Sequence, residues 1–136
     1  MKLPTLIACG LLLATLGCAG LQIAAVVEPG ASFTLAPGQT AAVNGADARI
    51  TFKRVPEDSR CPVDVTCVWA GDAKVEITIS RNGAADGTRI LSITPPNQEA
   101  TVGNLRIRFV SLAPIPRQAD GNAPRNYRAE FIVDQV

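Results

Sequence analysis

The sequence predicts an all-β fold, a small antiparallel β-sandwich with one disulfide. No window after residue 31 shows the apolar period of an amphipathic helix. Short runs instead alternate apolar and polar residues, as strands with one buried face do. Turn-forming residues separate these runs at intervals of about 8–12 residues, which indicates about seven or eight short strands. The chain has 136 residues, a length that suits one folded domain behind an export segment.

The first seventeen residues have the form of a bacterial signal peptide. Lys2 supplies the positive start, and residues 6–16 form an apolar stretch of the usual length. This stretch is short for a transmembrane helix, which needs about 20 apolar residues. An uncleaved anchor that continues through residues 21–27 is the alternative.

Cys18 is the predicted site of lipidation. Gly17 and Cys18 match the end of a lipobox, whereas Thr15 and Leu16 match it poorly. The rival is ordinary cleavage farther along, for example after Gly20. We therefore expect a signal peptide over residues 1–17, a lipid-anchor tether over 18–31 and a β-sandwich domain over 32–136.

The expected strands follow from the alternation, taken in order along the chain. The turn at Asn44-Gly45 separates two of them, and Pro95-Pro96 separates two others. Long loops are expected at 56–73 and 114–124, with a shorter one at 82–87. The strands are expected at residues 32–35, 40–43, 47–55, 74–81, 88–94, 98–102, 104–112 and 126–136.

The long loop around residues 58–71 holds Cys61 and Cys67, which we expect to form a structural disulfide in an exported protein. Their spacing is not the C-x-x-C of redox motifs. The chain has no histidine, the most common zinc and copper ligand, so no metal or other cofactor is expected. Arg60, Pro62, Asp64 and Trp69 are the candidate contact residues of this loop.

Trp69 follows Cys67 by two residues. If this segment is extended, both side chains lie on one face, and we expect the indole to cover the disulfide inside the core. The alternative is an exposed Trp69 at a binding surface, where tryptophan is enriched.

The string D-S-R-C-P-x-x-V-x-C-V-W-A-G at residues 58–71, with Phe52 and Val55 before it, resembles a motif in a family of uncharacterised bacterial secreted proteins and lipoproteins. The resemblance is specific over residues 52–73. It implies a location in the bacterial cell envelope and a β-rich fold, and it carries over no catalytic residue.

Composition and motifs argue against several classes of function. Removing residues 1–17 takes away one charged residue, Lys2, which leaves 12 basic and 12 acidic side chains and gives no reason to expect nucleic-acid binding. The four carboxylates near the cysteines, at positions 57, 58, 64 and 72, match no known calcium loop. No histidine, S-x-x-K or G-x-S-x-G supports a serine nucleophile.

We therefore expect a non-catalytic protein rather than an enzyme. Its expected role is that of a binding or structural module, a lipoprotein of the cell envelope with an envelope protein or a glycan as partner. Its link to the membrane would be a lipid anchor, while a periplasmic or secreted form is the other location. The alternative function is a secreted inhibitor that presents the disulfide loop to an enzyme cleft.

Overall fold

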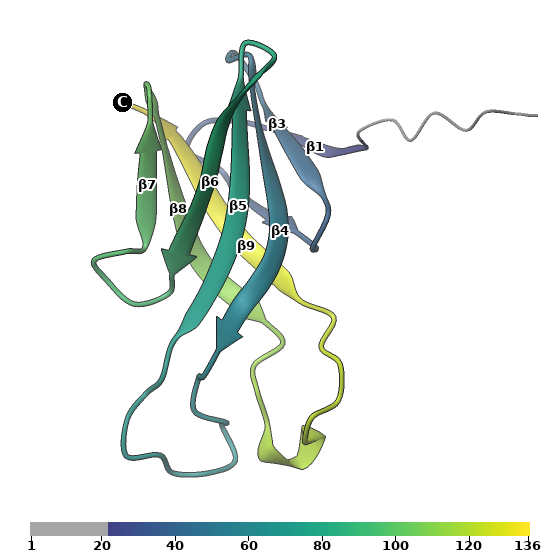
Figure 1. The fold of residues 1–136 in the computed structure, drawn as a ribbon, viewed down its shortest axis with the longest axis vertical. Helices are drawn as coiled ribbons and strands as arrows, with labels where there is room; N and C mark the ends of the chain where they lie inside the picture. Colours follow the sequence, from purple (N-terminus) through teal and green to yellow (C-terminus); the bar gives the residue numbers. More distant parts are fainter. Residues whose placement is uncertain (1–21) are drawn as a thin grey trace, which may run out of the picture.

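The computed structural model describes residues 22–136, which form two β-sheets packed face to face (Figure 1). The predicted signal peptide and Cys18 lie outside the described residues. Within the described part the structure has nine strands and one short 3-10 helix, η1 (Gln118–Asp120). The strands are β1 (Ile23–Val27), β2 (Ser32–Leu35), β3 (Thr40–Val43), β4 (Ala48–Asp58), β5 (Ala73–Arg81), β6 (Ala84–Ser92), β7 (Glu99–Val102), β8 (Leu105–Ala113) and β9 (Arg128–Gln135).

One sheet has the strand order β1-β3-β4-β5-β6 and the other has the order β2-β9-β8-β7. Every pairing is antiparallel except the one between β1 and β3. The predicted disulfide-containing, all-β sandwich is confirmed. One strand was not expected, because β1 occupies residues that the sequence suggested as part of the tether.

The core lies between the sheets and is centred on Phe131 of β9. Its ring centroid is 5.9 Å from that of Phe33, 6.0 Å from that of Phe52 and 5.8 Å from that of Phe109. Phe52 comes from the opposite sheet, so this aromatic cluster joins the two layers. The predicted inward residues of β5 (Val75, Ile77, Ile79) are fully buried, as are those of β8 (Leu105, Ile107, Phe109).

The connection between β5 and β6 is tighter than the sequence reading of residues 82–87 suggested. Asn82 and Gly83 both have positive φ angles, 50° and 75°, and β6 begins at Ala84. Two positive φ angles in a two-residue loop are the geometry of a type I′ turn, which asparagine and glycine favour. The expected loop therefore contains part of a strand.

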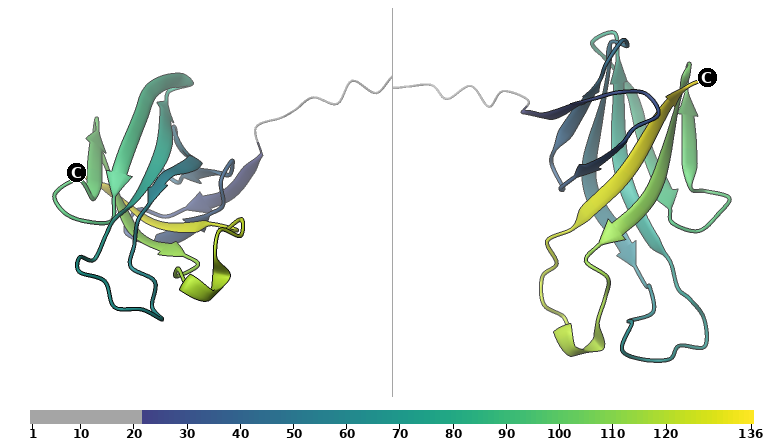
Figure 2. Two further views of the ribbon diagram at one scale, coloured as in Figure 1. Left: turned by 60° about the horizontal axis from the view of Figure 1, so that its bottom comes forward. Right: turned by 180° about the vertical axis from the view of Figure 1, so that it is seen from behind.

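The long hairpins extend beyond the sandwich at one end of the molecule. There the loop between β4 and β5 lies beside the loop between β8 and β9 (Figures 1 and 2). We call these two loops, residues 59–72 and 114–127, the loop end. Within residues 22–136 the structure contains no helix with the length and apolar character that a membrane crossing requires.

Candidate functional site

The first loop of the loop end is closed by the predicted disulfide. Cys61 and Cys67 are bonded, with their Cα atoms 5.9 Å apart. Between the strands and the disulfide, two backbone hydrogen bonds continue the pairing of β4 with β5 into the loop. They run from Ser59 N to Asp72 O (2.7 Å) and from Cys61 N to the carbonyl of residue 70 (3.0 Å). The conformation of the loop is thus fixed by the disulfide and by these two backbone hydrogen bonds.

Gly71 allows the two sides of this loop to approach closely. Its φ angle is +70°, a left-handed conformation that other residues adopt at a cost. A Cβ atom at this position would lie 1.7 Å from the carbonyl oxygen of Ser59, which is backbone and cannot rotate away. Only glycine fits here without a shift of the main chain.

Arg60 points into the molecule, so its assignment as a contact residue is wrong. Its guanidinium group binds both carboxylate oxygens of Asp58, at 2.7 and 2.9 Å. It also donates to the carbonyl oxygens of Leu112 (2.5 Å) and Pro114 (3.0 Å), and its side chain is 14% exposed. Arg60 therefore attaches the cysteine loop to the end of β8.

Asp58 is the centre of this polar network. Besides Arg60, its carboxylate accepts hydrogen bonds from Arg125 Nη1 (3.4 Å) and from the hydroxyl of Tyr127 (3.0 Å). Only 5% of its side chain is exposed. Burial by itself would raise the pKa of Asp58, but hydrogen bonding and the positive charge of Arg60, with the Tyr127 hydrogen bond, outweigh it and hold the pKa below its usual value.

Asp64 joins the two loops. Its carboxylate accepts hydrogen bonds from the backbone N–H groups of Gln118 (2.7 Å) and Ala119 (3.2 Å), which lie in η1 of the other loop. These bonds lower the pKa of Asp64, because they stabilise its charged form. The N–H of Val63 donates to Pro116 O (3.0 Å), while the neighbouring Pro62 is half-buried. The two loops are therefore braced against each other.

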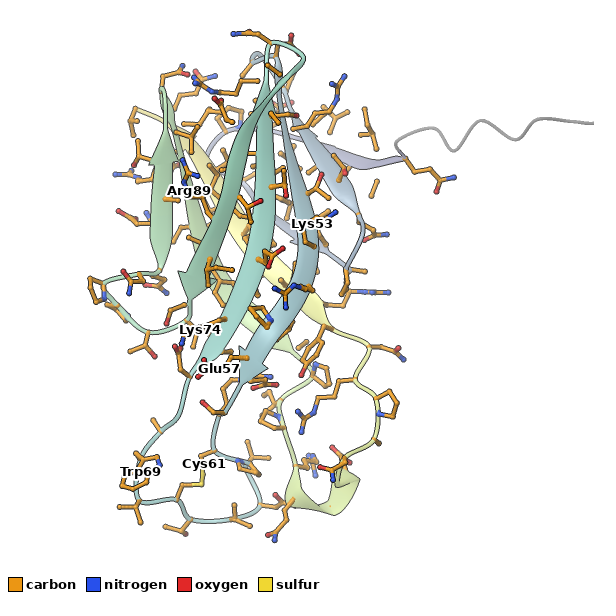
Figure 3. All side chains as sticks on the ribbon, in the orientation of Figure 1. Lys53, Glu57, Cys61, Trp69, Lys74 and Arg89 are labelled. Atoms are coloured by element: carbon orange, nitrogen blue, oxygen red, sulfur yellow. A yellow bond between two sulfur atoms is a disulfide. The ribbon has the colours of Figure 1, made fainter. Side chains whose placement is uncertain are left out.

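Trp69 is 78% exposed, so the expectation that it packs in the core over the disulfide is wrong. It lies on the outer side of the loop, beyond the sandwich (Figure 3). β5 begins only at Ala73, so the segment around Trp69 is not an extended strand and no opposing sheet faces it. The alternative that the sequence left open, an exposed tryptophan, describes this side chain.

Further exposed apolar side chains share the loop end with Trp69. Val68 is 91% exposed, and Ile115 projects from the second loop with 62% exposure. We call this set the apolar tip: Val63, Val65, Val68, Trp69 and Ile115. Sequence reasoning missed its aliphatic members, although apolar residues in a non-alternating, proline-containing segment were a usable signal.

A hollow of about 520 Å³ lies within the second loop. Its wall is mainly apolar, with a carboxylate, a guanidinium group and an amide among the lining side chains. The lining residues are Ala113, Pro114, Asp120, Ala123, Pro124, Arg125 and Asn126. Because Arg125 also reaches Asp58, this hollow belongs to the same braced structure.

The acidic residues near the cysteines bind different groups and do not converge on one point. The carboxylate of Asp72 accepts hydrogen bonds from Ser92 Oγ (2.7 and 2.8 Å) and Thr94 Oγ1 (3.2 Å). Burial would raise the pKa of Asp72, but these hydrogen bonds and that of the Ala73 N–H lower it overall. Across residues 22–136, no three Cys, Asp or Glu side chains gather closely enough to hold a metal ion together.

Comparison with protein-family models, with curated proteins and with solved structures gives no match to this chain. The motif resemblance over residues 52–73 stays a prediction. The geometry and chemistry of the loop end are therefore the basis for assigning a function.

Proposed function

We propose that this protein is a non-catalytic binding module of the bacterial cell envelope, lipid-anchored at Cys18, and that the apolar tip contacts its partner. One observation carries the proposal: Trp69 is 78% exposed on a loop fixed by a disulfide. Exposed apolar patches mark interaction surfaces, and the exposed Val68 and Trp69 are adjacent in this loop. Tryptophan in particular is enriched among the residues that dominate binding energy.

The rigidity of the loop end favours binding. The disulfide, Gly71 and the contacts of Arg60 and Asp64 fix the loop before any partner arrives. Association then orders fewer groups, so more of the contact energy appears as affinity. A flexible apolar loop would lack this advantage.

The charges at positions 61–71 favour an apolar partner surface. Asp64 is the only charged residue among positions 61–71, and its carboxylate is occupied by two backbone N–H groups. Positions 61–71 hold no cation that would attract an anionic polymer, although Arg117 of the second loop is exposed near Asp64. We therefore favour an envelope protein with an apolar groove, while a glycan that stacks on the indole of Trp69 is the other partner class.

The test is a photo-crosslinking residue at Val68, compared with one at Ile90 on β6, an exposed position outside the loop end. The partner identified at position 68 is then purified and its affinity measured for Trp69→Ala and for the matched control Ile90→Ala. We expect Trp69→Ala to weaken binding by at least about 2 kcal/mol, roughly 30-fold. Both side chains are exposed, so both variants should keep the wild-type stability within about 0.5 kcal/mol. Equal affinities for the two variants would refute the apolar tip as the contact surface.

The second candidate function, a secreted inhibitor, is favoured by the convex and braced form of the cysteine loop. Because Arg60 is turned inward, such an inhibitor would insert Val68 and Trp69 rather than Arg60. This function predicts that the captured partner is an enzyme that loses activity at equimolar protein and keeps it with Trp69→Ala. A partner without enzymatic activity would eliminate this candidate.

Lipidation needs a test of its own, the intact mass of the protein recovered from its own envelope. A lipid-sized addition on a chain that starts at Cys18 would support the anchored module. An unmodified chain that starts beyond Cys18 would instead assign the protein to the periplasm or the medium.

A further inference from the structure

β1 is an integral strand of the five-stranded sheet, and it begins five residues after Cys18 in the sequence. It pairs with β3 through four residues, and the carbonyl oxygen of its last residue, Val27, accepts a hydrogen bond from Asn44 N (2.8 Å). Val27 is 6% exposed and belongs to the core. The folded domain therefore starts near Ile23 rather than after a long tether.

The length of chain between Cys18 and the domain is short. From Cys18 to Ile23 there are five peptide steps, which span at most about 16–18 Å when fully extended. A lipid attached to Cys18 would therefore hold the start of β1 within about that distance of the membrane surface. This step rests on the lipidation that we proposed above.

The surface beside this point has the chemistry of a membrane contact. β1 is an edge strand and exposes two apolar side chains, Ile23 (45%) and Val26 (68%). Val26 is paired with Ala42 of β3, which is paired with Arg49 of β4, so all three lie in one row across the sheet. Among the described residues, neither Arg49 nor Lys53 of the same strand has a carboxylate within ion-pair distance.

Three carboxylates lie in the same region, and among the described residues two of them, Glu28 and Asp47, also have no cation within ion-pair distance. Glu28, just after β1, accepts a hydrogen bond from Asn44 Nδ2 (2.7 Å), and Glu76 of β5 is paired with Arg54 (2.6 Å). Asp47, at the start of the hairpin to β4, is exposed. Apolar side chains beside unpaired cations suit the headgroup layer, where aliphatic groups enter and phosphates attract Lys and Arg.

We propose that the lipidated protein rests on the phospholipid surface that holds its anchor, through the β1 edge and the adjoining outer face of β3 and β4. Ile23 and Val26 enter the interfacial layer, and Arg49 and Lys53 face phosphate groups. In Figure 1 and the right view of Figure 2, β1 lies in the half of the molecule opposite the loop end. This placement leaves Trp69 in the aqueous phase, available to a partner.

The experiment uses the full lipidated protein in vesicles that contain anionic phospholipid. A spin label is attached at Val26→Cys or Ile23→Cys, with Thr88→Cys on β6, the opposite edge of the sheet, as the matched control. In a chain processed at Cys18 the three remaining native cysteines would be lipidated or in the disulfide, so the introduced thiol is the one that reacts. Collision rates with oxygen, which enters the bilayer, and with a water-soluble nickel complex report the position of each label.

We expect labels at positions 23 and 26 to collide more with oxygen than with nickel, at about 5–10 Å into the headgroup boundary. The label at 88 should collide with nickel, and the single tryptophan, Trp69, should stay quenchable by iodide. Charge reversal in Arg49→Glu/Lys53→Glu should reduce the oxygen preference at position 26, whereas Arg89→Glu on β6 should not.

Nickel accessibility at all labelled positions would refute the orientation, because it means that the domain hangs free from its anchor. A shielded Trp69 would refute it as well, since the loop end would then face the membrane. Either result can be distinguished from a failure of the proposed lipidation, because the intact mass of the same sample is measured first. A mass without the lipid would refute the anchor itself. Circular dichroism of each variant confirms that the exposed substitutions leave the fold intact.

Discussion

Replacing the buried Asp58 with asparagine should destabilise the protein far more than substitutions of exposed loop residues. The variant keeps the volume of the side chain and one acceptor oxygen, but it removes the negative charge. Arg60 and Arg125 would then share a buried position with no carboxylate, while the hydroxyl of Tyr127 would lose its charged acceptor. Removing one partner of a buried ion pair is costly, because the remaining charge stays poorly solvated.

The magnitude follows from the contacts of Asp58. Breaking a buried pair by removing one charge costs about 3–5 kcal/mol. Arg60 retains the carbonyl oxygens of Leu112 and Pro114, and Arg125 is 24% exposed, so part of this cost is relieved. We therefore expect Asp58→Asn to lower the free energy of unfolding by about 3 kcal/mol, the low end of that range. The control Asp120→Asn, in the exposed η1, should change it by less than about 0.5 kcal/mol.

The assay is urea unfolding followed by circular dichroism, with the fluorescence of Trp69 as a local probe. A double-mutant cycle with Arg60→Gln isolates the pair, and we expect a coupling energy of about 1–3 kcal/mol. The pH dependence of the free energy of unfolding gives a second test of the role of Asp58. Since the pKa of Asp58 is lower in the folded protein than its usual 3.8, its contribution is complete above that value and is lost as the pH falls through the folded pKa. The difference between wild type and Asp58→Asn should therefore shrink in acid; a loss below about 0.5 kcal/mol at neutral pH, or additive variants, would refute the reasoning.

Three further predictions concern the loop and the core. Gly71→Ala should lower the melting temperature and shift the Trp69 emission, because its Cβ would collide with the backbone of Ser59; an unchanged melting curve would contradict the observed approach. Replacing both Cys61 and Cys67 with serine should cost about 2 kcal/mol in urea unfolding, the loop-closure entropy of so short a ring, and retention of full stability would show that other contacts suffice. Phe131→Ala should cost about 3–5 kcal/mol, since its ring meets three other phenylalanines, and a smaller loss would mean that the core collapses around the gap.

The candidate site could be predicted only in part. The sequence located the loop, its disulfide and Asp64, because cysteines, proline and charged residues concentrate there. It could not show that Arg60 points inward, since its acceptors on residues 112 and 114 are more than 50 positions away. The exposure of Trp69 depends equally on where β5 begins and on what lies opposite, and neither is encoded within a few residues.

The sequence by itself determined most of the strands and which of their faces are buried; β1 and the first part of β6 are the exceptions. Alternation with a period of two acts within one strand, so Val75, Ile77 and Ile79 could be assigned to the core without knowledge of their neighbours. The turn-forming residues and the spacing of the cysteines are likewise local signals. This is why the all-β class and the disulfide followed from the sequence.

Only the tertiary structure decided which strands meet and in which register. It pairs β1 in parallel with β3, although residues 23–27 carry no alternation that distinguishes a strand from a tether. It also aligns Thr40, Thr51, Thr78 and Thr88 in one row across four strands, which no single strand specifies. Pairing is set by packing between residues far apart in the chain, and the same long-range packing places the two loops side by side and leaves the apolar tip exposed.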